Sequence, residues 1–90
     1  MKAYELLDSE DKWTKIYLAR DKNDDGINDP LSPKAVKWCV LGAIYKCYGY
    51  NHSTPHFKKL YEHTGQLSVA DWNNTNSYQT IFNTLKELNI

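Results

Sequence analysis

Residues Ser32 to Tyr48 read SPKAVKWCVLGAIYKCY, and this stretch decides the fold. Read at helical spacing, its apolar side chains cover almost the whole circumference, and only three lysines interrupt them. A helix that is apolar all round is buried on several sides. Ser32 can cap the first turn with its hydroxyl, and Pro33 suits the first helical position, where no backbone N–H is needed. The sequence therefore predicts a central buried helix over residues 32–48.

Gly42 falls in the middle of this predicted helix. Glycine in a helix interior costs roughly 1 kcal/mol relative to alanine. A close approach of another backbone segment would compensate for that cost, because only a residue without a Cβ permits it. We therefore expect such a contact at Gly42.

The 90 residues are expected to form a single domain, residues 1–90. Three Trp, seven Tyr and two Phe let this small chain bury much area with few side chains. Residues 1–30 carry eight acidic and five basic side chains (−3), and residues 31–90 carry three acidic and six basic ones (+3). This asymmetry is too modest for a polybasic surface, so no nucleic-acid partner is expected.

The two cysteines, Cys39 and Cys47, lie eight residues apart in the predicted helix. That spacing separates them by roughly 12 Å along a helix axis, which is too far for a disulfide between them. They are predicted to be reduced thiols. The sequence has no charged-then-apolar leader and no run of eighteen apolar residues. A cytoplasmic protein with no membrane partner is therefore expected.

Four other segments carry weaker signals. Residues 2–7 can form a short helix. Residues 13–29 fit either a two-stranded β-hairpin around the turn-forming KNDDG or a helix and loop, with the hairpin slightly favoured. Thr54-Pro55 repeats the cap-then-proline signal and predicts a helix to about Thr64. Residues 67–77, LSVADWNNTNS, are predicted to be irregular because their side chains favour local turns.

The C-terminal segment has a clean helical stripe. Its apolar positions at i, i+3, i+4, i+7 and i+10 are Tyr78, Ile81, Phe82, Leu85 and Leu88. This helix is predicted to begin at Asn76 or Ser77 and to pack across the central helix. The expected fold is mainly α, a compact small helical domain around the helix at 32–48, with a short β-hairpin at 13–29.

The acidic turn at residues 21–29, DKNDDGIND, resembles the first part of a calcium-binding loop. Its side-chain ligands would be Asp21, Asn23, Asp25 and Asp29. However, the twelfth position holds Ser32 instead of a bidentate carboxylate, and tight turns select the same residue types. A solvated acidic turn is therefore favoured, and calcium is the one cofactor that the sequence suggests.

No catalytic constellation is recognisable in the sequence. Cys39 falls on the apolar surface of the predicted helix, where burial makes a thiol unreactive. The carboxylates of Glu62 and Asp71 are not brought together by their spacing, and no phosphate-binding glycine loop occurs. The chain is therefore predicted not to be an enzyme, with a small enzyme of unrecognised type as an alternative.

Aromatic residues gather in sequence around the loop at residues 48–57. Tyrosine and phenylalanine are enriched at protein interfaces. The candidate interaction residues are Tyr45, Tyr48, Tyr50, Phe57 and Tyr61. The favoured alternative is that most of these rings complete a small core.

Three motifs together resemble a known pattern. They are WT at residues 13–14 with ARD at 19–21 and Gly26, the segment AVKWCVLGAI at 35–44, and Trp72-Asn73-Asn74 before the last helix. This pattern resembles a family of small uncharacterised bacterial and phage proteins, a domain of unknown function with WT…ARD…G, AVxWCxxGA and WND motifs. The chain departs from it at Asn74, where the family has aspartate. That departure favours a capping or turn role for position 74.

The resemblance implies no settled activity, but it does imply a protein that occurs with phages or mobile elements, in the cytoplasm of a bacterial host. Small phage proteins often bind and block a host enzyme or defence complex, which is an argument by analogy. Together with the tyrosine-rich loop, it leads us to expect a small protein–protein interaction module, such as a phage-encoded modulator or inhibitor of a host or defence protein. The alternatives are a calcium-binding or metal-stabilised domain using the turn at 21–29, and a small enzyme.

Overall fold

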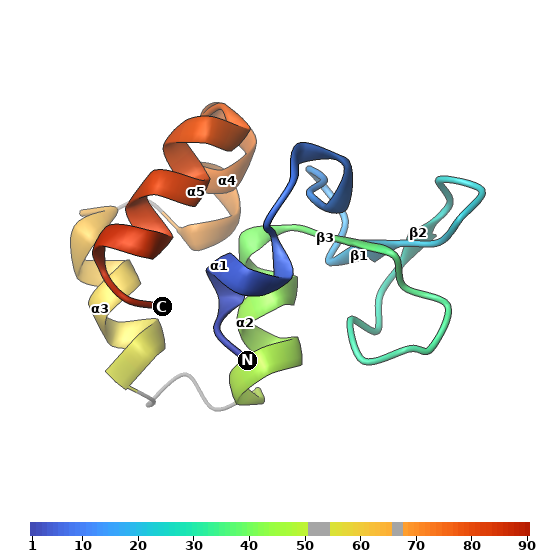
Figure 1. Ribbon diagram of the computed structural model, residues 1–90, viewed down its shortest axis with the longest axis horizontal. Coiled ribbons are helices and arrows are strands. Elements are labelled where there is room, and N and C mark those ends of the chain that lie inside the picture. Colours follow the sequence, from blue (N-terminus) through green and yellow to red (C-terminus); the bar gives the residue numbers. More distant parts are fainter. Residues whose placement is uncertain (51–54, 66–67) are drawn as a thin grey trace.

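The structure is a computed structural model that describes residues 1–50, 55–65 and 68–90. Within these residues the helices are α1 (Ala3–Leu6), α2 (Val40–Tyr48), α3 (Pro55–His63), α4 (Val69–Thr75) and α5 (Tyr78–Glu87), with a 3-10 turn, η1, at Glu10–Lys12. The strands are β1 (Ala19–Arg20), β2 (Gly26–Ile27) and β3 (Lys37–Trp38). The helices gather at one end of the molecule and the strands at the other, with α2 between them (Figure 1). The fold is thus rich in helix without being purely helical.

The three strands form an antiparallel sheet in the order β2-β1-β3. Ala19 of β1 lies opposite Ile27 of β2 on one side and opposite Trp38 of β3 on the other. The hairpin favoured for residues 13–29 is therefore confirmed as the pair β1 and β2. The third strand comes from the segment that was expected to be helical.

The prediction of one helix over residues 32–48 is wrong in its first half, because α2 begins only at Val40. The residues before it are extended and pair with the segment around β1. The backbone N–H of Val36 donates to the carbonyl of Arg20, and that of Cys39 donates to the carbonyl of Leu18. Instead of capping a helix, the hydroxyl of Ser32 accepts the backbone N–H of Lys34 in a turn.

Cys39 provides the N-cap of α2. Its Sγ accepts the backbone N–H of Gly42 at 3.3 Å. The contact expected at Gly42 is confirmed, although Gly42 lies in the first turn of the helix and not in its middle. A Cβ built there would stand 1.9 Å from the carbonyl oxygen of Leu18, so only glycine lets α2 pack against the chain leading into β1.

The prediction that residues 67–77 are irregular is also wrong. Residues Val69–Thr75 form α4, capped by Ser68, whose hydroxyl accepts the backbone N–H of Asp71. Val69, Trp72 and Asn73 lie at i, i+3 and i+4, and all three are buried. These three residues form the buried face of α4, which packs against α2. Leu67 lies outside the described residues.

The remaining helices were largely predicted. The short helix expected at residues 2–7 appears as α1, and the helix expected from Pro55 to about Thr64 appears as α3, while Thr54 lies outside the described residues. α5 begins after Ser77, which caps it. α5 packs against α1, and α1, α3 and α4 pack against α2; Ile81 and Leu85 of α5 share one core cluster with Ile44 of α2.

The core lies among these helices and the inner face of the sheet. Its largest fully buried apolar side chains are Leu7, Val40, Ile44, Leu60, Ile81, Leu85 and Ile90. Among the described residues, no helix has the length and apolar character needed to cross a membrane.

Candidate functional site

Asn73 is a fully buried polar residue that joins three segments of the chain. Its Oδ1 accepts the indole N–H of Trp13 at 2.7 Å and the backbone N–H of Val40 at 2.9 Å. Its Nδ2 donates to the carbonyl of Thr14 at 3.1 Å. One amide on α4 therefore fixes both the start of α2 and the segment before the sheet.

The neighbouring Asn74 holds an unusual turn in place. Its Oδ1 accepts the backbone N–H of Ile16 at 3.0 Å, and the N–H of Tyr17 donates to the carbonyl of Lys15 at 2.9 Å. Ile16 has φ of 77°, and these features define a γ-turn centred on it. We call residues Lys15–Tyr17 the Ile16 turn. A β-branched residue in this region of φ is a true outlier, because its Cβ crowds the backbone.

The side chain of Ile16 points into solvent, with 77% of its surface exposed. Before and after Ile16 in the sequence there is an aromatic ring with a cation near its face. The guanidinium of Arg20 lies 4.9 Å from the ring centre of Tyr17, and the ammonium of Lys15 lies 5.4 Å from the ring of Trp13. The Ile16 turn therefore presents an exposed apolar side chain between a lysine and a tyrosine in the sequence.

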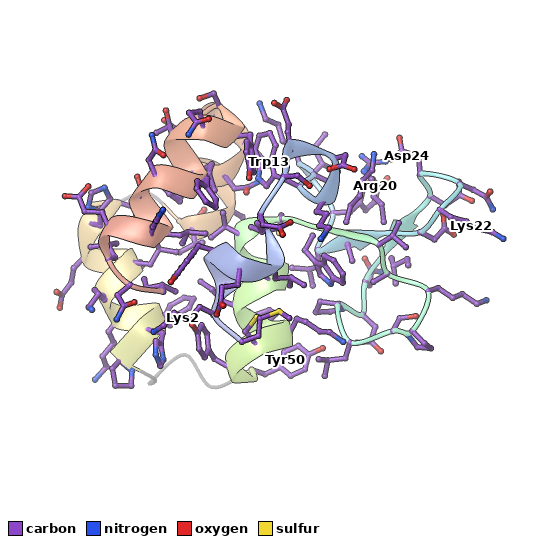
Figure 2. The ribbon with its side chains drawn as sticks, viewed as in Figure 1. Lys2, Trp13, Arg20, Lys22, Asp24 and Tyr50 are labelled. Atoms are coloured by element: carbon purple, nitrogen blue, oxygen red, sulfur yellow. The ribbon has the colours of Figure 1, made fainter. Side chains whose placement is uncertain are left out.

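Arg20 also ties the base of this turn to the sheet. Its Nε donates to Thr14 Oγ1 at 2.7 Å, and its Nη1 donates to the carbonyl of Asp24 at 2.8 Å. Figure 2 shows Arg20 and Asp24 near one another at the sheet end, with Trp13 toward the helices. The ring of Tyr17 lies against Gly26, where a Cβ would come within 2.4 Å of it. The Ile16 turn is thus fixed by contacts to the sheet, through Arg20 and Gly26, and to α4, through Asn74.

Residues from all three sequence motifs take part in these contacts or in the start of α2 beside them. Those with a direct structural role are Trp13, Thr14, Arg20, Gly26, Cys39, Gly42, Asn73 and Asn74. Asn74 uses its oxygen as the acceptor for Ile16, and an aspartate at the same place could accept the same bond. The asparagine in place of the family's aspartate is therefore compatible with a role in positioning the turn.

The five aromatic candidates differ in burial and in the rings that they contact. Tyr45 is buried, and its ring centre lies 4.7 Å from that of Tyr50. Tyr50, near the C-terminal end of α2 in Figure 2, is 52% exposed. Its hydroxyl donates to a carboxylate oxygen of Asp29 at 3.3 Å. This first group joins α2 to the loop before β3.

The other aromatic candidates belong to the contact of α2 with α3 or to α3 itself. The half-buried Tyr48 stacks on His56 with ring centres 3.9 Å apart, and its hydroxyl donates to the carbonyl of Ile90. Phe57 and Tyr61 stack on each other along α3, and Tyr61 is 48% exposed. Tyr50 and Tyr61 are thus the most exposed of the candidate interaction residues. The sequence did not indicate Ile16, which is more exposed than either of them.

The acidic turn uses its carboxylates to bind the protein's own backbone. Asp21 Oδ1 accepts the backbone N–H groups of Asn23 at 2.9 Å and Asp25 at 3.0 Å. Asp29 Oδ1 accepts the N–H of Leu31. Across residues 1–50, 55–65 and 68–90, no three His, Cys, Asp or Glu side chains are placed to hold a metal ion together. The geometry is that of a turn capped by its own side chains.

Cys39 lies in surroundings that suppress thiol chemistry. The residue is buried, and burial raises the pKa of its thiol above the ordinary value. A protonated thiol that caps a helix is a poor nucleophile.

No family model, curated protein or solved structure matches the chain. The resemblance to small bacterial and phage proteins therefore stays a prediction, and the function is argued from geometry.

Proposed function

We propose that the chain is a small protein–protein interaction module whose anchor is Ile16. The observation that carries the proposal is an exposed isoleucine with φ of 77°. A residue held in such a conformation costs on the order of 1–3 kcal/mol and is found mostly at functional sites. An apolar side chain in solvent contributes little to the stability of the free protein. Binding of a partner to Ile16 would account for both its strained backbone and its exposed apolar side chain.

The way in which Ile16 is held supports this proposal. The bond from Asn74 and the γ-turn fix the backbone before any partner arrives, so little conformational entropy is lost on binding. The next residue, Tyr17, is 43% exposed and provides aromatic surface, and aromatic residues dominate the energetics of many interfaces. The partner best suited to this surface has an apolar pocket for Ile16 and an acidic group near Lys15.

The class of partner is proposed from the resemblance. Small phage proteins with this pattern would meet host proteins, so a host enzyme or defence complex is the partner that we propose, and the chain would act as its modulator or inhibitor. Binding rather than catalysis would then be the activity.

The first test replaces Ile16 and leaves the framework in place. Tagged wild-type protein, Ile16→Asp and the control Leu31→Ala are used to capture partners from a bacterial lysate, with mass spectrometry of the bound proteins. Leu31 is also an exposed aliphatic residue. A partner near one-to-one is expected with the wild type and with the control, and at least about tenfold less of it with Ile16→Asp. Equal capture by all three proteins would contradict the role of Ile16.

The second test separates strain from side-chain loss. Ile16→Gly removes the side chain but also removes the steric cost of positive φ, so we expect its free energy of unfolding to be unchanged or raised by about 1 kcal/mol while binding is lost. Asn74→Asp should retain binding, and Asn74→Ala should weaken it. If Ile16→Gly were strongly destabilising, the turn would serve the fold instead of a partner.

A further inference from the structure

Within residues 1–50, 55–65 and 68–90, one edge of the sheet has no neighbouring strand. The strand order is β2-β1-β3. On the β3 side the edge is covered, because Trp13 forms a bridge with Trp38 and the backbone N–H of Thr14 donates to the carbonyl of Trp38 at 3.1 Å. β2 pairs with β1 alone and lies at the end of the molecule away from the helices (Figure 1). The outer side of β2 is therefore the free edge of the sheet.

The peptide groups of β2 alternate in direction. Ile27 is paired with β1, and the N–H of Asp21 donates to the carbonyl of Asp25 at 3.0 Å. A trans peptide places its carbonyl and its N–H on opposite sides of the chain, so the N–H of Gly26 points away from β1. By the same alternation, the carbonyl of Gly26 and the N–H of Asn28 also point outward. Both residues are exposed, so these groups are open to a further strand.

Carboxylates flank this free edge. Residues 21–29 hold four aspartates and one lysine. Asp25 and Asp29 stand two residues before and two residues after Ile27, so an extended chain places all three on one face. A strand paired with the edge would therefore set one residue beside Ile27 and one beside each carboxylate. Opposite charges that face each other across two strands stabilise the pairing, and like charges oppose it.

A second copy of the chain is a poor occupant of the free edge. In a two-fold antiparallel pairing centred on Ile27, Asp25 of each copy would face Asp29 of the other. Charged side chains on an edge strand are a common means of preventing such pairing between copies. A basic segment of another protein meets no repulsion from these carboxylates.

We propose that the free edge of β2 binds an extended peptide segment that has an apolar residue at its centre and a basic residue two positions away on each side. The backbone of the segment bonds to the outward peptide groups of β2, its apolar side chain lies beside Ile27, and its two cations face Asp25 and Asp29. Addition of a strand to a sheet edge is a common mode of peptide recognition. Because the edge is short, we expect a dissociation constant on the order of 1 mM. The inference goes beyond the proposed function, since it needs no partner at Ile16.

The probe is the peptide acetyl-Lys-Thr-Val-Thr-Lys-amide. It is titrated to about 10 mM, well above the expected constant, into isotope-labelled protein while the amide signals are followed by NMR. We expect saturable shifts that are largest at Gly26, Ile27 and Asn28. The same peptide with glutamate in place of both lysines should bind at least about fivefold more weakly. Ile16→Asp should bind the lysine peptide as the wild type does, which keeps this test separate from that of the proposed function.

Methylation of the peptide's own backbone nitrogens separates strand pairing from charge attraction alone. With the valine opposite Ile27, the N–H groups of the two threonines face β2 and the N–H of the valine faces away. N-methylation of both threonines should therefore abolish the shifts. N-methylation of the valine is the matched control and should leave binding nearly unchanged.

Charge reversal on the protein tests the contribution of the flanking carboxylates. Asp25→Lys should weaken binding of the lysine peptide about fivefold or more and strengthen binding of the glutamate peptide. Glu87→Lys makes the same charge change at an exposed position of α5 and should alter neither. Circular dichroism checks that both variants are folded.

Three results would overturn the proposal. They are the absence of saturable shifts up to about 10 mM peptide, equal binding of the lysine and glutamate peptides, and undiminished binding of the peptide that is N-methylated on its threonines.

Discussion

Asn73 places a polar amide in the interior, where leaving any of its hydrogen-bond partners without a bond is costly. Truncation by Asn73→Ala would leave the indole N–H of Trp13 and the backbone N–H of Val40 without their acceptor. Each unsatisfied buried donor costs about 1–3 kcal/mol, so we expect a loss of about 2–5 kcal/mol in the free energy of unfolding.

Urea unfolding followed by tryptophan fluorescence measures this loss. Asn83→Ala is the matched control, because Asn83 is exposed on α5 and its amide oxygen accepts a hydrogen bond from the side chain of Gln79. We expect this control to change the free energy of unfolding by no more than about 0.5 kcal/mol. A loss below about 1 kcal/mol for Asn73→Ala would show that water replaces the missing oxygen.

Single residues were predictable where their chemistry has one common use. Glycine at position 42 indicated a close backbone contact, and the contact exists. The turn role favoured at Asn74 agrees with its bond to Ile16. The conformation of Ile16 could not be predicted, because positive φ runs against the intrinsic preference of isoleucine and depends on an amide 58 residues away.

At the level of elements, α2 is fixed where its first turn meets the carbonyl of Leu18. Gly42→Ala would place a Cβ 1.9 Å from that oxygen, and backbone atoms cannot yield as a flexible side chain can. The helix would have to move away and lose the Cys39-to-Leu18 hydrogen bond. Although alanine is the better helix former, we expect a destabilisation of about 1–3 kcal/mol or more from overpacking.

Thermal unfolding of Gly42→Ala tests this, with Lys46→Ala as the control in the same helix because Lys46 is exposed. The control should change stability by no more than about 0.5 kcal/mol. If Gly42→Ala were more stable than the wild type, the higher helix propensity of alanine would outweigh the steric clash with the carbonyl of Leu18.

The elements that the sequence misjudged share a physical cause. Strands of two residues, such as β3, are too short to show the alternation that marks a strand. The apolar residues of that strand therefore seemed to continue the helix that follows. In α4, asparagine and threonine suggested turns, but Thr75 and Asn76 satisfy their polar groups on the helix's own carbonyls. The long-range contacts that reassign such segments are not visible in local patterns.

At the scale of the whole molecule, two tyrosines join distant parts of the chain and make its stability sensitive to alkaline pH. The hydroxyl of Tyr78 donates to the carbonyl of Leu7 at 2.6 Å, and that of Tyr48 donates to the carbonyl of Ile90. Burial is the main reason that the pKa of each phenol lies above its ordinary value of 10.0. A pKa raised in the folded state gives stability that is complete below pH 10 and is lost as the pH rises through the folded value.

We therefore expect the melting temperature to fall steeply above about pH 10. In Tyr78→Phe the fall in melting temperature above about pH 10 should be shallower. Near neutral pH the free energy of unfolding of this variant should be lower by about 1 kcal/mol, because the hydrogen bond to Leu7 is missing. Tyr61→Phe serves as the matched control for removing a surface phenol. If the melting temperature fell equally steeply above about pH 10 in the wild type and in Tyr78→Phe, groups other than Tyr78 would cause the loss of stability at alkaline pH.

The bonds of Asn73 also bear on how long the native state lasts. Trp13 and Val40 stand 60 and 33 residues from it in the chain, so the amide meets its partners only after large loops have closed. We expect these contacts to form after the folding transition state, so that their main effect is on the unfolding rate. The buried amide would then slow the opening through which proteases gain access, and Asn73→Ala should raise the unfolding rate more than it lowers the folding rate.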